Sequence, residues 1–157
     1  MKHIQSWVLV IVAAWFFGCS TPQNSTEDET GRPPLELKYL GTAGWEISDG
    51  NVVVLIDPYI SRLKYGGGGH PDDDRPDFAR NDIAQSDTAL IDRTITRADF
   101  ILVHHGHFDH LGDVPYIAAK TGAKVIGTET TITILRAYGI PEDQLYAVGG
   151  GEDYLFD

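Results

Sequence analysis

The sequence has little of several residue types, and each scarcity excludes a class of protein. A single cysteine, Cys19, rules out a disulfide bond within the chain. Only 12 lysine and arginine residues stand against 23 aspartate and glutamate residues, so the formal net charge is −11. An acidic chain without a basic run is a poor partner for nucleic acid, and we expect no nucleic-acid ligand. The apolar run at residues 7–17 has eleven residues, whereas a membrane-spanning helix needs about 20.

The first 34 residues have the pattern of a targeting segment followed by a spacer. The short apolar run ends at Gly18-Cys19, which resembles a bacterial lipoprotein signal, although Phe16-Phe17 replaces the usual leucine and small residue. The resemblance implies a signal peptide at residues 1–18, acylation of Cys19, and a protein anchored by lipid to a membrane of the bacterial cell envelope, facing the periplasm or exterior. An ordinary signal peptide or an uncleaved anchor is the alternative. Residues 19–34 are polar and without apolar periodicity, so we expect a disordered tether.

Residues 35–157 have the periodicity of one α/β domain, which is also what the length allows. Strand and helix alternate after position 99, a pattern typical of an α/β layer. We expect strands at 35–40, 45–47, 52–56, 99–103, 124–126 and 144–148, with a further strand beginning at 153–156. We expect helices near 87–96 and over 114–121 and 128–138, with Asp113 as the acceptor that caps the second of them rather than a metal ligand.

Residues 61–97 interrupt this pattern. Four consecutive glycines at 66–69 and the run from His70 to Arg75 offer nothing to a core. Long loops beside active sites often form lids or substrate walls, and a solvated insertion without a role is the alternative. His70 and the three aspartates at 72–74 could bind a metal, but aspartate runs are usually solvated, and we favour that interpretation.

Residues 101–113, Ile-Leu-Val-His-His-Gly-His-Phe-Asp-His-Leu-Gly-Asp, carry most of the chemistry. His105, His107, Asp109 and His110 fall within six positions, and this density of imidazole and carboxylate suits a divalent ion such as zinc. Alternation sends His105 and His107 to one side of an extended segment, and Asp109 and His110 follow where the chain can turn. One loop can therefore serve two adjacent metal positions. By the same alternation His104 points away from His105 and packs at the strand end; a supporting role or a spare ligand is the alternative.

The segment His105-Gly106-His107-Phe108-Asp109-His110 resembles the His-x-His-x-Asp-His motif of the metallo-β-lactamase-fold hydrolases. Leu-Gly-Thr-Ala-Gly-Trp at 40–45 and Leu-Ile-Asp-Pro-Tyr at 55–59 are similar to that family's opening strands, and Asp57 matches its first motif. The resemblance covers residues 35–157, poorly over 61–97, and is closest to the branch that contains ascorbate-6-phosphate lactonase. It implies the N-terminal half of an αββα sandwich.

The family places a further histidine, a bridging aspartate and a final histidine downstream, and no histidine follows His110 in this sequence. We therefore expect a fragment or an incomplete gene model that is itself inactive. In the full-length protein two zinc ions are implied, one held by His105 and His107 and the other by Asp109 and His110.

The resemblance implies a zinc-dependent hydrolase in which a metal-bound hydroxide attacks a small-molecule ester or lactone. Asp109 would also orient the nucleophile, and Asp57 would hold a ligand ring. Two alternatives stay open: a phospholipid or phosphate-ester phosphodiesterase of the same fold, and a non-catalytic metal-binding lipoprotein fragment.

Overall fold

The computed structural model describes residues 31, 33–64, 77–79 and 81–156. The predicted signal segment, Cys19, nearly all of the tether and the glycine run with His70 lie outside these residues. Within the described ranges, no helix has both the length and the apolar character needed to cross a membrane.

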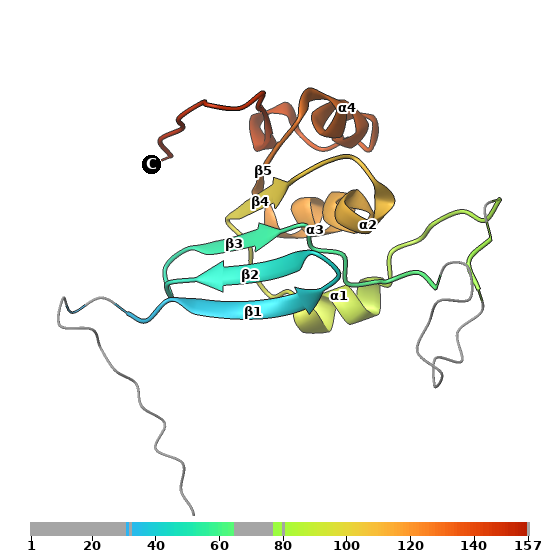
Figure 1. Ribbon diagram of the computed structural model, residues 1–157, viewed down its shortest axis with the longest axis horizontal. Helices are drawn as coiled ribbons and strands as arrows, with labels where there is room; N and C mark the ends of the chain where they lie inside the picture. The colour runs from blue at the N-terminus through green and yellow to red at the C-terminus, as the bar shows by residue number, and fades with distance from the viewer. Residues whose placement is uncertain (1–30, 32, 65–76, 80, 157) are drawn as a thin grey trace, which may run out of the picture.

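A six-stranded sheet is built in the order of the sequence, and Figure 1 shows its first three strands side by side. The first three strands form an antiparallel meander, and the third to the sixth run parallel. The strands are β1 (Glu36–Gly41), β2 (Gly44–Ser48), β3 (Val53–Ile56), β4 (Phe100–Val103), β5 (Lys124–Gly127) and β6 (Leu145–Ala147). Because β3 and β4 are parallel neighbours, their carboxyl ends meet at one edge of the sheet, and the predicted metal residues follow these two ends.

Helices connect the parallel strands and bury one face of the sheet. They are α1 (Thr88–Thr94), α2 (Phe108–Leu111), α3 (Val114–Thr121) and α4 (Glu129–Ala137), with a 3-10 turn, η1 (Glu142–Gln144), before β6. Leu55, Ile101 and Val125 project from adjacent strands into this core, where they join Ile117 of α3 and Leu135 of α4. The α/β prediction is confirmed, because strands and helices alternate and the apolar side chains on one face of β3, β4 and β5 are buried under helices.

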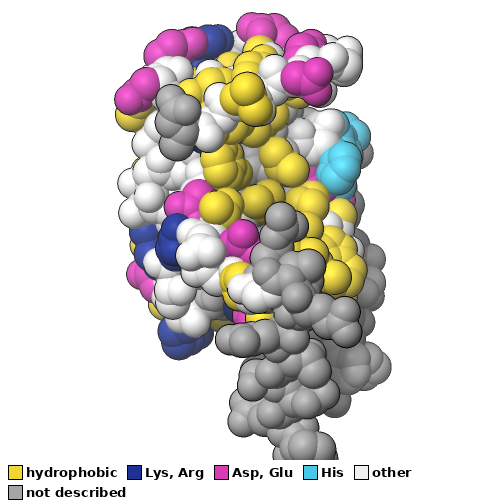
Figure 2. All heavy atoms as spheres, turned by 90° about the vertical axis from the view of Figure 1, so that its left-hand side faces the viewer, with side chains coloured by type: hydrophobic (Ala, Val, Ile, Leu, Met, Phe, Trp, Pro, Cys, Tyr) yellow, Lys and Arg dark blue, Asp and Glu magenta, His cyan; other side chains and the backbone are white. Residues whose placement is uncertain are grey.

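The opposite face of the sheet exposes apolar side chains. Leu37 and Tyr39 of β1 are 62% and 59% exposed, and Trp45 of β2, which pairs with Tyr39, is 41% exposed. At the other end of this face, Phe156 packs against Phe100 with ring centroids 4.8 Å apart. Figure 2 shows hydrophobic side chains gathered across one side of the molecule, with histidines at its edge. Apolar area of this kind favours association.

We expect Leu37→Glu to lower the binding of a hydrophobic dye by this chain and to reduce its self-association in sedimentation experiments. The free energy of unfolding should change by no more than about 0.5 kcal/mol, because the side chain is exposed. Ile83→Glu is the matched control, since Ile83 is 84% exposed and lies outside every strand. Equal dye binding by the wild type and Leu37→Glu would show that the face does not drive association.

Two expectations about secondary structure are wrong. Residues 153–156 form no strand, because Tyr154 and Phe156 pack edge-on against Tyr146 instead of pairing with the sheet edge, and the Tyr154 hydroxyl donates to the carbonyl of Ala147. The turn expected at Asp109 and His110 is the one-turn helix α2, Phe108–Leu111. Gln144, the expected start of the last strand, belongs to η1, so β6 begins one residue later.

Candidate metal centre

Asp57 and His104 occupy equivalent places at the ends of two adjacent parallel strands. Ile56 of β3 is in register with Leu102 of β4, and the backbone N–H of Asp57 donates to the carbonyl of Leu102 at 3.0 Å. This pairing continues the ladder for one residue past β3. It brings the side chain of Asp57 beside the first residue after β4, which is His104.

Asp57 is fully buried and has a positive φ of 41°. That conformation is uncommon for residues other than glycine, and such strain is often found at functional sites. Burial acts to raise the pKa of its carboxyl group, but hydrogen bonds from the backbone N–H of His104 and from the rings of His110 and His104 outweigh it and hold the pKa below its ordinary value. Asp57 is therefore a carboxylate at neutral pH.

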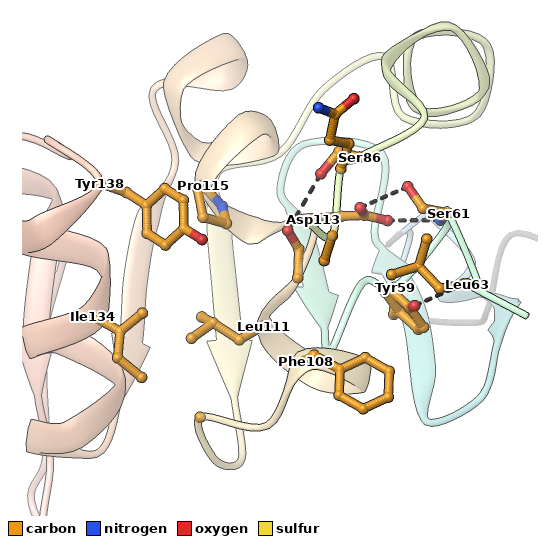
Figure 3. A pocket seen from close by; sticks show the side chains of 14 residues that line it. Tyr59, Ser61, Leu63, Ser86, Phe108, Leu111, Asp113, Pro115, Ile134 and Tyr138 are labelled. Carbon is orange, nitrogen blue, oxygen red and sulfur yellow. Dashed lines mark hydrogen bonds between the residues drawn. The ribbon is translucent and has the colours of Figure 1, made fainter. Parts of the chain in front are cut away.

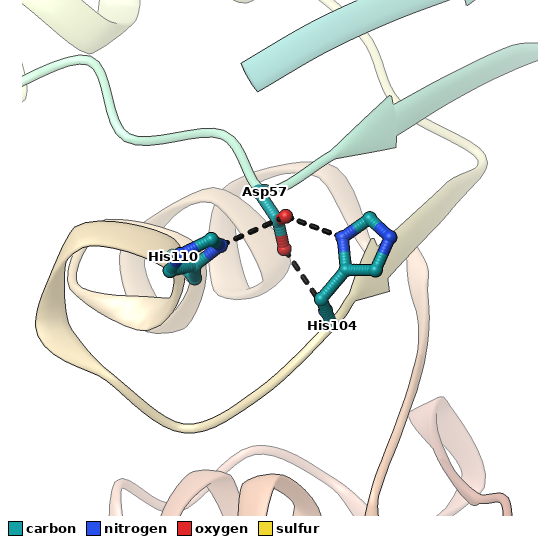
Figure 4. A group of neighbouring side chains, drawn as sticks. All are labelled: Asp57, His104 and His110. Atoms are coloured by element: carbon teal, nitrogen blue, oxygen red, sulfur yellow. Dashed lines mark hydrogen bonds and ion pairs between the residues drawn. The ribbon is translucent and has the colours of Figure 1, made fainter. Parts of the chain in front are cut away.

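The carboxylate of Asp57 lies between two imidazole rings (Figure 4). Its Oδ1 accepts the backbone N–H of His104 at 2.9 Å, and its Oδ2 lies 2.5 Å from Nδ1 of His104. The same Oδ2 is 2.8 Å from Nδ1 of His110. This approach of His110 departs from ideal hydrogen-bond direction, but its buried Nδ1 has no other polar partner among the described residues. We therefore treat the contact as the one that orients the His110 ring.

The rings of the motif converge on the other side of His110. His105 Nε2 and His107 Nδ1 are 2.9 Å apart, and the ring centroids of His105 and His110 are 4.1 Å apart. Nε2 of His110, the nitrogen turned away from Asp57, is 3.7 Å from Oδ2 of Asp109. His107 immediately precedes α2, and Asp109 and His110 lie in its single turn, so the helix brings these side chains together.

These donors fit zinc. With bonds of about 2.0–2.2 Å, two ligand atoms on a tetrahedral zinc lie about 3.3–3.5 Å apart. His110 Nε2 and Asp109 Oδ2 at 3.7 Å lie near that value, whereas His105 Nε2 and His107 Nδ1 at 2.9 Å are at hydrogen-bond distance and would have to move apart to share an ion. Neutral imidazole and carboxylate are also the ligand types that zinc accepts. Among the described residues, the one group of three or more such side chains whose ligand atoms all lie within 4.8 Å of one another is Asp57, His104 and His110.

The structure brings together the five residues singled out from the sequence: His105, His107, Asp109, His110 and Asp57. Their assignment as ligands or catalytic groups stays a prediction, but their proximity is a finding. The expectation that His104 packs at the strand end is wrong, because its side chain is 70% exposed and its ring turns toward Asp57. Parallel pairing of the strands at 52–56 and 99–103 is the signal that would have placed His104 beside Asp57.

Asp113 does not cap α3, although it stands at the N-cap position. Its Oδ2 accepts the backbone N–H groups of Ile60 and Ser61, both at 2.7 Å, and its Oδ1 accepts the Ser61 hydroxyl at 2.7 Å. The buried carboxylate therefore ties the segment after β3 to the segment after α2. The cap prediction fails because unpaired backbone groups from a distant segment compete for the same oxygens.

A cavity of about 190 Å³ lies behind the motif, and Figure 3 shows Asp113, Tyr59 and Phe108 among its walls. The back of the motif, Gly106 and Phe108, contributes to it, but none of the motif histidines does. We therefore place the candidate site at the cluster of metal-binding side chains and not in this cavity.

Comparison with known proteins identifies the family. Residues 53–152, more than half of the chain, match the model of the Beta-lactamase superfamily domain. The chain therefore belongs to the β-lactamase superfamily, as the motif at 105–110 indicated. The fold of the described residues, a mixed sheet covered on one face by helices, is one half of the sandwich expected for it.

Three similar proteins are informative. The chain is 32% identical over 121 residues to a metal-dependent hydrolase of Anaeromyxobacter dehalogenans strain 2CP-C, which covers 76% of this chain and 36% of that protein. It is 35% identical over 121 residues to a metal-dependent hydrolase of Myxococcus xanthus strain DK1622, covering 76% and 34%. Igni18, a metallo hydrolase from the archaeon Ignicoccus hospitalis, has a related fold, with a TM-score of 0.52 at 22% identity over 77% of this chain and 42% of that one. The chain thus spans about a third of the length of these two relatives.

Proposed function

We propose that this chain supplies the metal-binding loop of a zinc-dependent hydrolase that acts on a small-molecule ester or lactone. The observation that carries the proposal is the convergence of His105, His107 and His110 at the end of β4, with Asp109 beside them and a buried carboxylate behind. The names of the relatives, metal-dependent hydrolases, support the same reaction class.

Each residue has a definite task in this proposal. His105 and His107 would hold one ion, since Nε2 of the first and Nδ1 of the second face each other. Asp109 and His110 hold a second ion, and Asp109 also orients the attacking water. A bound zinc ion lowers the pKa of water to about 7 and polarises the substrate oxygen. Asp57 keeps the proton of His110 on Nδ1 and so leaves Nε2 with a free lone pair.

The test is metal analysis and a substrate panel on the full-length gene product. Because the motif is assigned to two ions, we expect about two zinc ions per chain. We also expect hydrolysis of esters or lactones that stops when a chelator removes the metal and returns when zinc is added. A protein that holds no metal above background at micromolar zinc would contradict the proposal. Hydrolysis of phosphodiesters alone would replace the proposed substrate class with the alternative one.

A phosphodiesterase that acts on phospholipids is the second candidate. The observation that favours it is the N-terminal segment ending at Gly18-Cys19, since a lipid anchor would hold an enzyme at a membrane substrate. Vesicle phospholipids and water-soluble esters in the same panel distinguish the two candidates.

The anchor has a direct test. We expect the protein expressed in a bacterium to incorporate labelled fatty acid and to partition into detergent with the membrane fraction. Cys19→Ala should abolish the labelling, because the thiol is the acylated group, whereas Ser20→Ala should keep it. Equal labelling of wild type and Cys19→Ala would contradict the lipoprotein proposal.

A further inference from the structure

We infer that His104 is a positioning residue for the metal centre: its ring clamps Asp57 so that the same carboxylate oxygen stays directed at His110. The inference rests on the proposed function, since it deepens the account of the same site. It assigns a role to a side chain that precedes the metal motif and that sequence alternation placed elsewhere.

The contact made by the ring is separate from the one made by the backbone. The N–H of His104 donates to Oδ1 of Asp57, and any residue other than proline would supply that donor. The ring Nδ1 lies 2.5 Å from Oδ2, the oxygen that also faces His110 at 2.8 Å. Only a side chain with a donor at this position can hold Oδ2, so the identity of residue 104 determines how Asp57 is fixed.

Burial makes this contact important for orientation. Asp57 is 0% exposed, so its oxygens depend on protein donors and not on bulk water. The His104 side chain is 70% exposed and the His110 side chain is 16% exposed. Because His104 contributes little to the buried core, removing its ring should loosen Asp57 without creating a cavity in that core.

The distances favour a hydrogen-bonded clamp over a metal site made of Asp57, His104 and His110. Two ligands of one tetrahedral zinc lie about 3.3 Å apart or more. Oδ2 is 2.5 Å from Nδ1 of His104, a hydrogen-bond contact, and 2.8 Å from Nδ1 of His110, which is hydrogen-bond length although its direction departs from ideal. Both rings must then carry a proton on Nδ1, which leaves Nε2 of His110 as an acceptor facing Asp109 and Nε2 of His104 as an acceptor at the surface.

Three variants of the full-length gene product test the clamp: His104→Ala, His104→Asn and His104→Gln. An asparagine amide can place a donor close to the position of Nδ1, whereas the glutamine amide lies one methylene farther out. We measure zinc affinity by competition with a chromophoric chelator and check folding by thermal denaturation. Loss of a group that orients a ligand lowers metal affinity about 10–100-fold. We expect a loss in this range for Ala and Gln and recovery of most of the affinity for Asn, with all three proteins folded.

A second measurement does not need metal. In the zinc-free protein, ¹⁵N-correlated spectra of the imidazoles report which nitrogen carries the proton. We expect Nδ1–H on both His104 and His110 in the wild type, and loss of the fixed Nδ1–H form of His110 in His104→Ala but not in His104→Asn.

The outcomes separate the clamp from the proposed function. Wild-type protein that binds no zinc contradicts the proposed function, and the spectra of the metal-free protein still decide on the clamp. If the wild type and His104→Ala bind zinc with the same affinity, the clamp is overturned and the hydrolase proposal stays intact. The same conclusion follows if the wild type carries the His104 proton on Nε2. Equal losses in all three variants would also overturn it, because the Asn donor would then restore nothing.

Discussion

Replacing His105 or His107 with alanine should remove zinc from the protein and abolish hydrolysis together. The two ring nitrogens face each other at 2.9 Å, so each variant deletes one of two donors to the same ion. Residues that only support a ligand change metal affinity about 10–100-fold, and loss of a ligand itself should exceed about 100-fold. The measurements are metal content after gel filtration and the rate of ester hydrolysis by the full-length gene product at saturating zinc.

His70→Ala is the matched control for these variants, because it removes an imidazole that lies outside the motif. It should keep both metal and activity. If His105→Ala keeps its zinc while His104→Ala loses it, the motif is assigned out of register by one residue. The roles of Asp109 and His110 would then have to be assigned again.

Asp113→Ala should cost about 3 kcal/mol in free energy of unfolding, the largest stability effect that we expect from a polar residue of this chain. The fully buried carboxylate accepts two backbone N–H groups and one hydroxyl from Ile60 and Ser61, all at 2.7 Å. Its removal deletes all three hydrogen bonds, and an unsatisfied buried group costs about 1–3 kcal/mol. Urea denaturation followed by circular dichroism provides the measurement.

Two further variants make that result specific. Asp113→Asn retains an acceptor oxygen but loses the charge, so its loss of stability should be smaller. Asp143→Ala removes an exposed carboxylate from η1 and should change the free energy of unfolding by less than about 0.5 kcal/mol. A loss for Asp113→Ala no larger than that for Asp143→Ala would show that the three hydrogen bonds do not hold the segment after β3.

The elements that the sequence predicts well are those whose pattern is local. The run at 52–56 is aliphatic throughout and follows a turn, so β3 is evident, and α3 and α4 are marked by helical spacing and by the glycines that follow them. The motif at 105–110 is equally local. Its four side chains are close in the chain, and a strand end followed by one turn of helix is enough to bring them together.

What the sequence does not predict depends on contacts between distant segments. The direction of the His104 ring is set by Asp57, 47 residues away in the chain, and the partners of Asp113 lie 52 and 53 residues away. Strand alternation predicts that His104 packs at the strand end, and helix capping predicts that Asp113 caps the helix N-terminus. Both predictions consider only residues that are close in the sequence. Tyr154 and Phe156 likewise look like the start of a strand, but both rings pack edge-on against Tyr146 instead.

The most direct test of the central claim is the position of the metal itself. Crystals of the full-length gene product soaked in zinc, with diffraction data collected on both sides of the zinc absorption edge, would locate each ion by its anomalous signal. We predict one peak within bonding distance of Nε2 of His105 and Nδ1 of His107, and a second beside Asp109 and Nε2 of His110. Zinc bound only between Asp57 and His104, or found nowhere near the motif, would contradict the account.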